Sequence, residues 1–231
     1  MSRKIGISFS LTNFQKYWDW FADEDVERIE LSFEKNNVED FAKCDGFVLT
    51  GGLDINCSLY NEQDNRLKPE PYSAERDIFE SKIFHYSQEN NIPLLAICRG
   101  LQLVNILQGG KLLQETGADD IHRKSPGGVD KIHEIYVERK SLLFEITNTP
   151  AGKVNSAHHQ AVKIDALGKN LVANAWYMND DDNKMVEGLE FEDKTGKAFM
   201  LAVQWHPERM PDRNSPFSKN IKDRFIKEIS K

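Results

Sequence analysis

Short apolar runs alternate with segments of helical periodicity along the first half of the chain. The run at residues 46–50 predicts a buried strand, and the run at residues 93–97 is typical of a strand buried on both faces. In the segment 73–90, apolar side chains recur at helical spacing. The predicted strands are residues 5–9, 29–33, 46–50 and 93–97, and the predicted helices are residues 17–22, 73–90 and 101–107. This alternation predicts a parallel α/β sheet covered by helices.

The second half of the chain has a different pattern, in which strands follow one another closely. The predicted strands here are residues 170–176, 185–191 and 198–204. Residues 193–196 join the last two strands and predict a hairpin turn. A final helix is expected after Ser215, because serine at the N-cap followed by Pro216 is a typical helix start. The later strands predict an antiparallel extension of the parallel sheet.

The composition is that of an ordinary globular protein, and it excludes several function classes. The 231 residues include 39% hydrophobic side chains, enough for a full core, so collagen-like and mostly disordered classes are excluded. The net charge of −7 argues against nucleic acid as a partner. We see no linker, so we expect one domain over residues 1–231.

Targeting and redox signals in the sequence favour a cytoplasmic location. No apolar run approaches the ~20 residues that span a bilayer, so no membrane association is expected. The N-terminal residues lack the apolar region of a signal peptide. Only three cysteines are present, an odd and sparse count that does not resemble a disulfide framework.

Three polar stretches predict surface structure. Residues 61–71 and 116–130 are long enough to form surface loops, which are often the places where functional sites are built. The acidic run at residues 180–183 suggests calcium, but it lacks the glycine and the distal glutamate of a calcium-binding loop. We therefore interpret that run as a solvated turn.

The segment around Cys98 is the most informative in the chain. An apolar strand leads into this cysteine and a helix follows at once, which is the nucleophile-elbow pattern with cysteine in place of serine. The sharp turn requires small residues two positions on either side, and Ala96 and Gly100 supply them. A helix N-terminus also lowers the pKa of a thiol. The competing interpretation is a buried cysteine ahead of an ordinary helix.

A histidine and a glutamate near the end of the chain fit the needs of such a cysteine. His206 follows the strand at residues 198–204, and Glu208 lies two positions on, with a stiffening proline between them. A cysteine nucleophile needs a base, and the base needs an acceptor that orients it. The alternative is a strand-end histidine beside a surface glutamate.

Two glycines, Gly51 and Gly52, end the strand at residues 46–50. They free the backbone to approach a ligand closely, and open parallel sheets bind ligands at the carboxyl ends of their strands. An N–H group of this loop together with that of Arg99 would form an oxyanion hole. Taken in isolation, the segment also fits a simple glycine turn.

The three segments together resemble the class I glutamine amidotransferase superfamily, whose triad is Cys-His-Glu. The sequences at residues 76–80 and 154–160 are similar to the stand-alone γ-glutamyl hydrolase branch of that superfamily. The resemblance implies a flavodoxin-like three-layer sandwich with a mostly parallel central sheet. It also implies hydrolysis of a γ-glutamyl amide through a glutamyl thioester, with Cys98, His206 and Glu208 as catalytic residues.

The resemblance further implies where the substrate binds and which partners are needed. The implied oxyanion-hole residues are Gly52 and Arg99, and the implied substrate-binding residues are Gly51, Gln102, Ser156, Ala157 and His158. We assign His158 and His159 to the substrate pocket rather than to a metal, because no carboxylate or cysteine completes a ligand set at a recognisable spacing. We expect a small-molecule γ-glutamyl substrate, with no metal and no organic cofactor. The sequence is compatible with a homodimer but does not determine the oligomeric state.

The sequence departs from the branch in one loop. Relatives usually have a proline soon after the Gly-Gly-x-Asp motif and a glycine after the next tyrosine, where this chain has Cys57 and Asn61. Because this loop lies on the substrate side, the sequence does not determine which amine is released. Two rival functions remain, a glutaminase subunit that delivers ammonia to a partner synthase and a binding protein that has lost turnover.

Overall fold

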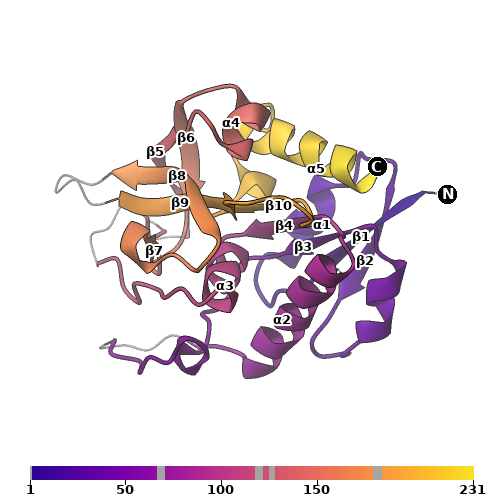
Figure 1. Cartoon of the computed structure of the whole chain (residues 1–231), viewed down its shortest axis with the longest axis horizontal. Helices are drawn as coiled ribbons and strands as arrows, with labels where there is room; N and C mark the ends of the chain where they lie inside the picture. The colour runs from indigo at the N-terminus through magenta and orange to yellow at the C-terminus, as the bar shows by residue number, and fades with distance from the viewer. Residues whose placement is uncertain (1, 67–70, 118–121, 125–127, 179–183) are drawn as a thin grey trace.

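The protein forms one mixed β-sheet between two layers of helices (Figure 1). The computed structural model describes residues 2–66, 71–117, 122–124, 128–178 and 184–231. Within them the strand order is β2-β1-β3-β4-β10-β9-β8-β5-β6, and β7 pairs with β9. The strands are β1 (Arg3–Ser8), β2 (Val26–Leu31), β3 (Gly46–Leu49), β4 (Leu94–Ile97), β5 (Lys131–Val137), β6 (Ala151–Ser156), β7 (Val162–Lys163), β8 (Leu171–Met178), β9 (Lys184–Phe191) and β10 (Met200–Val203).

The parallel part of the sheet brings distant segments of the chain to one edge. Strands β2, β1, β3, β4 and β10 are parallel neighbours in that order. In the register of β4 and β10, Ile97 pairs with Val203. The residues that follow these two strands therefore emerge side by side, at the carboxyl edge where open parallel sheets bind ligands.

The antiparallel part begins at β9 and is larger than predicted. Strand β9 runs antiparallel to β10, and β8, β5 and β6 continue the sheet in the same way. The predicted strand at residues 198–204 was expected in this extension, but β10 also pairs in parallel with β4 and completes the parallel part. Strands β5 and β6 were not predicted, although His133, Ile135 and Val137 alternate with more exposed residues along β5.

Two hydrophobic cores lie on opposite faces of the sheet. The helices are α1 (Phe14–Trp20), α2 (Ala74–Glu89), α3 (Arg99–Leu107), α4 (Leu142–Thr147) and α5 (Ile221–Ile229). Helices α2 and α3 pack against Phe47 and Leu49 on one face. Helices α1, α4 and α5 pack against Val48 and its neighbours on the other (Figure 1). This α/β sandwich confirms the predicted fold class.

Capping and turn chemistry explain where the predicted elements begin and end. Ser73 caps α2 by accepting the Arg76 N–H at 3.2 Å. Ser215 accepts the Phe217 N–H at 3.3 Å, but the first turn after it is a π-helical turn that precedes α5. A turn forms one residue beyond the predicted range 193–196, closed by the Lys197 N–H and the Lys194 carbonyl at 3.2 Å with Gly196 at φ 68°, within the connection from β9 to β10. The turn predicted at residues 180–183 lies outside the described residues.

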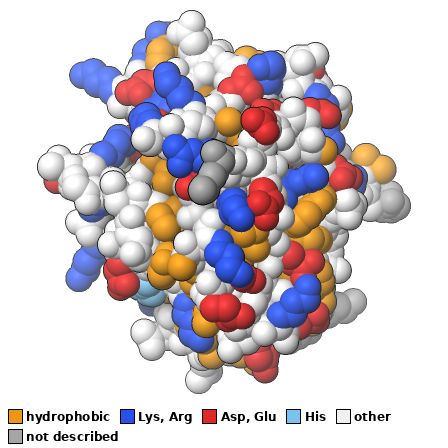
Figure 2. All heavy atoms as spheres, turned by 90° about the vertical axis from the view of Figure 1, so that its right-hand side faces the viewer, with side chains coloured by type: hydrophobic (Ala, Val, Ile, Leu, Met, Phe, Trp, Pro, Cys, Tyr) orange, Lys and Arg blue, Asp and Glu red, His pale blue; other side chains and the backbone are white. Residues whose placement is uncertain are grey.

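Acidic and basic side chains are interspersed on the face that carries the two chain ends, so neither sign dominates it (Figure 2). Among the described residues, every helix is too short or too polar to cross a membrane. All three cysteines are buried free thiols.

Candidate active site

Cys98 stands at a strained elbow between β4 and α3. Strand β4 ends at Ile97 and α3 begins at Arg99, so a single residue makes the turn. Cys98 takes φ 53° and ψ −104°, a conformation that side chains other than glycine rarely adopt and that often marks functional sites. A Cβ atom at Gly100 would lie only 2.7 Å from the carbonyl oxygen of Leu49. The elbow therefore requires glycine there, as the sequence pattern predicts.

His206 and Glu208 meet the cysteine from the end of β10. Nδ1 of His206 donates to Oε1 of Glu208 at 2.9 Å, and the carboxylate is fully buried. The His206 backbone N–H donates to the side chain of Asn155 at 3.2 Å, which fixes the turn. Burial by itself would lower the pKa of His206. The Glu208 carboxylate and the Cys98 sulfur outweigh that effect and raise the pKa to about 9.

The pKa of Cys98 shifts in the opposite direction to that of His206. Burial by itself would raise the pKa of the Cys98 thiol, but the positive charge of His206 and its hydrogen bond to the sulfur produce a net lowering. A lowered thiol pKa and a raised imidazole pKa favour the same protonation state. That state is a thiolate–imidazolium pair, which is the reactive state of a nucleophilic cysteine.

The glycine loop after β3 lies beside this pair. The Gly51 N–H donates to Oη of Tyr17 at 2.9 Å, and the Gly51 carbonyl accepts from Ser10 and from Arg76, each at 2.9 Å. Gly52, at φ 139°, lines the pocket. Both backbone polar groups of Gly51 are therefore engaged within the protein, whereas Gly52 faces the ligand space.

A buried ion-pair network joins this loop to the elbow. The guanidinium of Arg99 pairs with Asp77 and Glu80 of α2. Arg76 of the same helix donates to Glu80 at 2.9 Å and to the carbonyl of Thr50 at 3.1 Å. One helix thus holds both the glycine loop and the first residue of α3, and these are the two segments whose N–H groups would bind an oxyanion. The sequence identified residues 76–80 only through resemblance.

Tyr17 is a site residue that the sequence did not single out. Its hydroxyl lies 3.2 Å from Nδ1 of His206 and also accepts the Gly51 N–H. Burial, and then the charge of Glu208, raise the pKa of Tyr17 well above its usual value, so the phenol stays protonated. The residue lies on a predicted helix, but no motif marks it, because its role depends on where α1 docks.

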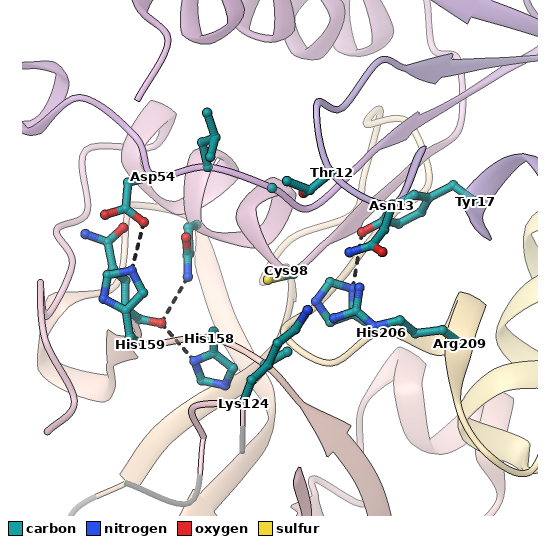
Figure 3. Close-up of a pocket in the computed structure, with 15 residues that line it drawn as sticks. Thr12, Asn13, Tyr17, Asp54, Cys98, Lys124, His158, His159, His206 and Arg209 are labelled. Carbon is teal, nitrogen blue, oxygen red and sulfur yellow. Dashed lines mark hydrogen bonds and ion pairs between the residues drawn. The ribbon is translucent and has the colours of Figure 1, made fainter. Parts of the chain in front are cut away.

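A cavity of about 270 Å³ opens above Cys98 (Figure 3). Of the residues predicted for the site, those that line it are Cys98, His206, Gly52, Gln102, Ala157 and His158. The others lie around or behind this lining, and Ser156 turns its hydroxyl to the carbonyl of His122 at 3.0 Å. The lining residues that the sequence did not assign to the site include Thr12, Asn13, Asp54, Lys124 and Arg209.

The predicted loops contribute unequally to this cavity. Lys124, from the loop at residues 116–130, directs its ammonium group at the space between Cys98 and His206 (Figure 3). In the loop at residues 61–71, Arg66 pairs with Asp54, which lines the cavity. The remaining residues of both loops are described only in part.

The two departures from the family pattern have structural explanations. Asn61 takes φ 58°, a left-handed conformation that asparagine and glycine both tolerate, so the turn is retained. Cys57 is buried, and its sulfur accepts the hydroxyl of Tyr60 at 3.2 Å. Neither side chain belongs to the cavity lining.

The fold places a carboxylate beside each histidine of the pair. The sequence shows no carboxylate or cysteine at a recognisable ligand spacing from His158 and His159, and the two carboxylates beside them come from distant segments. Nε2 of His158 lies 3.6 Å from Oε1 of Glu187, and Nε2 of His159 lies 2.9 Å from Oδ1 of Asp54. Glu187 lies on β9 and Asp54 follows β3, so no sequence spacing could reveal either pair.

Known proteins resemble this chain in sequence over most of its length. The family described as Peptidase C26 matches residues 30–208. The glutamine amidotransferase-like protein YvdE of Lactococcus lactis is 38% identical over 84% of this chain and 79% of its own length. The γ-glutamyl-γ-aminobutyrate hydrolase PuuD of Escherichia coli is 31% identical over 72% of this chain and 65% of its own length.

Solved structures share the fold at low sequence identity. The glutaminase domain of Trypanosoma brucei CTPS with bound acivicin superposes with a TM-score of 0.63 at 15% identity, over 100% of this chain and 94% of that one. A glutamine amidotransferase from Methylobacillus flagellatus superposes with a TM-score of 0.63 at 13% identity, over 99% of this chain and 95% of that one.

Proposed function

The chain belongs to the peptidase C26 family and is a hydrolase of the glutamine amidotransferase type, and on that premise we propose that it cleaves a γ-glutamyl amide bond and releases glutamate. The observation that carries the proposal is the position of Cys98, at an elbow that lines the cavity beside the His206–Glu208 pair. Weaker support comes from the γ-glutamyl-γ-aminobutyrate hydrolase among its relatives.

In the first half-reaction the Cys98 thiolate attacks the γ-carbonyl carbon. The N–H groups of Gly52 and Arg99 stabilise the oxyanion, because Gly52 faces the cavity and the first N–H groups of α3 have no partner within the helix. The His206 imidazolium donates its proton to the departing amine, which leaves a glutamyl thioester. Glu208 holds the imidazolium in place.

In the second half-reaction water replaces the amine. Neutral His206 takes a proton from water, and the resulting hydroxide attacks the thioester carbonyl. The carbon–sulfur bond then breaks, glutamate leaves, and the thiolate–imidazolium pair is restored. Every proton is carried by His206, so these steps require no metal or organic cofactor.

The lining of the cavity favours a substrate whose leaving amine is larger than ammonia and carries an acidic group. Lys124 and Arg209 both line it; Lys124 is exposed and directs its ammonium group at the space between Cys98 and His206, whereas Arg209 is paired with Asp130 at 2.6 Å. A carboxylate on the leaving amine, as in γ-glutamyl-γ-aminobutyrate, would meet the positive charge of Lys124. A relative of this chain is named as a hydrolase of that compound.

A panel of γ-glutamyl amides tests the proposal on the purified chain with a glutamate readout. We expect kcat/KM for amides of larger amines to exceed that for glutamine by at least ~10-fold, which is about 1.4 kcal/mol of transition-state binding. The Lys124→Met variant should lose the advantage of acidic amines over neutral ones of equal size, whereas Lys163→Met, an exposed control, should keep it.

The rival function is a glutaminase subunit that supplies ammonia to a partner synthase. Its support is the shared fold of a glutaminase domain. Equal or better turnover of glutamine, or turnover that appears only when a second protein is added, would favour this rival. No turnover of any amide by a correctly folded chain would favour a binding protein.

A further inference from the structure

A buried cluster of three histidines and one glutamate lies behind the wall of the cavity, and the proposed hydrolysis does not use it. Glu187 lies on β9, His133 on β5, His158 after β6, and His122 in the described segment 122–124. The side chains of the first three are exposed by 3% or less, and that of His122 is fully buried. His158 belongs to the cavity lining as well.

The three histidines converge on the Glu187 carboxylate at equal distances. Oε1 lies 3.6 Å from Nδ1 of His122 and 3.6 Å from Nε2 of His158, and Oε2 lies 3.6 Å from Nε2 of His133. These separations exceed a hydrogen bond. They are close to the ~3.4 Å between neighbouring donor atoms around a tetrahedral ion with bonds of about 2.0–2.1 Å. Single donor atoms of His122, His133 and Glu187 all lie within 4.8 Å of one another.

Several donor atoms of the cluster lack a hydrogen bond within the described part of the chain. They are both oxygens of Glu187, both ring nitrogens of His133 and Nε2 of His158. A buried carboxylate without hydrogen bonds is costly unless a cation lies beside it. At 3.6 Å the neighbouring imidazoles lie beyond hydrogen-bond distance of the carboxylate, and this spacing fits a positive ion between the four groups.

Surrounding contacts orient the rings as metal-ligating histidines are usually oriented. Nδ1 of His158 donates to the carbonyl of Gln160 at 2.9 Å, which leaves the Nε2 lone pair facing Glu187. Tyr177 packs against His133 with ring centroids 5.1 Å apart and against His122 at 4.7 Å. The Ser156 hydroxyl lies 3.5 Å from Nδ1 of His122. The rings are thus held before any ion binds.

We propose that His122, His133 and Glu187 bind a Zn²⁺-like divalent transition-metal ion, with His158 as the fourth donor at the edge of the site. Imidazole nitrogens with one carboxylate are a preferred donor set for such ions. The ion joins β5 and β9 to the segments that carry His122 and His158. It therefore fixes one wall of the cavity and takes no part in bond cleavage, so the proposal stands independently of the proposed hydrolysis.

The test is made in a Cys98→Ala background, because this thiol beside His206 could itself bind zinc. The protein is stripped with a chelator, reloaded separately with Zn²⁺ and with Co²⁺, and freed of excess ion. We expect about one equivalent of metal by elemental analysis, visible absorption bands of nitrogen- and oxygen-ligated Co²⁺, and a Tm that rises on loading.

Two further substitutions locate the ion. Adding His133→Asn should reduce the bound metal and the Co²⁺ bands at least ~10-fold, whereas adding His85→Asn, an exposed control on α2, should leave both unchanged. If the His133→Asn protein does not fold, the Cys98→Ala protein alone decides, because stripping must lower its Tm and reloading must restore it. Less than a tenth of an equivalent bound without a Tm change, or equal loss with either histidine variant, would overturn the proposal.

Discussion

Replacing Glu208 by glutamine should narrow the pH range in which the enzyme is active. The substitution keeps the shape of the side chain and an oxygen that can still accept Nδ1–H of His206, and it removes only the negative charge. That charge is the largest influence that raises the pKa of His206 to about 9. In the variant, the Glu208 charge no longer offsets the lowering of the His206 pKa by burial, so the imidazole loses its proton at lower pH.

The size of the effect follows from the same geometry. The rise in the pKa of His206 from an ordinary 6.5 to about 9 corresponds to about 3 kcal/mol in favour of the imidazolium. Glu208 is fully buried and lies 2.9 Å from the ring, so solvent screens little of this interaction. If all of it is lost, the pKa returns to about 6.5, so only about a quarter of the imidazole is protonated at pH 7 and kcat/KM there falls at least ~4-fold. Loss of the proton carrier in His206→Ala should cost more.

The assay is a pH profile of kcat/KM. The imidazolium is present below its pKa and is lost as pH rises through it, so the wild-type profile should fall near pH 9. In Glu208→Gln that basic limb should move toward neutral pH. The acidic limb should move to higher pH, because the Cys98 thiolate loses part of the stabilisation that the positive charge of His206 provides. Glu39→Gln, an exposed control with the same charge change, should match the wild type.

Two results would refute this reasoning. A Glu208→Gln profile that still falls near pH 9, with only its height reduced, would show that Glu208 orients the ring without setting its pKa. Near-normal turnover by His206→Ala together with an inactive Glu208→Gln would show that the two roles are assigned wrongly.

Three further substitutions test other parts of the site. Cys98→Ala should lower kcat by at least ~10³-fold with an unchanged circular dichroism spectrum, and a glutamine-like chloroketone should label Cys98 in the wild type by mass spectrometry; labelling confined to another cysteine would contradict the assignment. Tyr17→Phe removes the acceptor of the buried Gly51 N–H and should lower the free energy of unfolding by about 1–3 kcal/mol in urea titrations, with kcat reduced as well; full stability would show that this N–H finds another partner. Gly100→Ala places a Cβ 2.7 Å from the carbonyl oxygen of Leu49 and should cost about 1–3 kcal/mol by the same titration; an unchanged midpoint would mean that strand and helix separate freely.

Local sequence was enough to determine the elbow and the order of the proposed triad. Cys98 with Ala96 and Gly100 specifies a strand-to-helix turn, because a tight turn tolerates only small neighbours wherever it occurs. His206 and Glu208 are two residues apart, so their hydrogen bond depends on a single short turn. The alternation of apolar runs with helical periodicity similarly predicted the parallel sheet and its covering helices.

The antiparallel strands were less predictable than the parallel ones. A strand buried on both faces is a continuous apolar run, whereas β5 mixes buried and exposed positions and includes a buried histidine. Its His133 interrupts the apolar pattern because it packs into the cluster around Glu187 rather than into a hydrophobic core. A chain segment that serves a polar cluster gives a weak hydrophobic signal.

Only the tertiary structure could bring together residues from elements distant along the chain. Tyr17 reaches His206 because α1 docks on the sheet face beside β10. Glu187 reaches His158 because β7, which follows this histidine, pairs with β9. Strand order depends on the packing of whole faces, and no short sequence spacing encodes it. The sequence therefore determined the local chemistry of the proposed nucleophile, whereas the fold determined which side chains surround it.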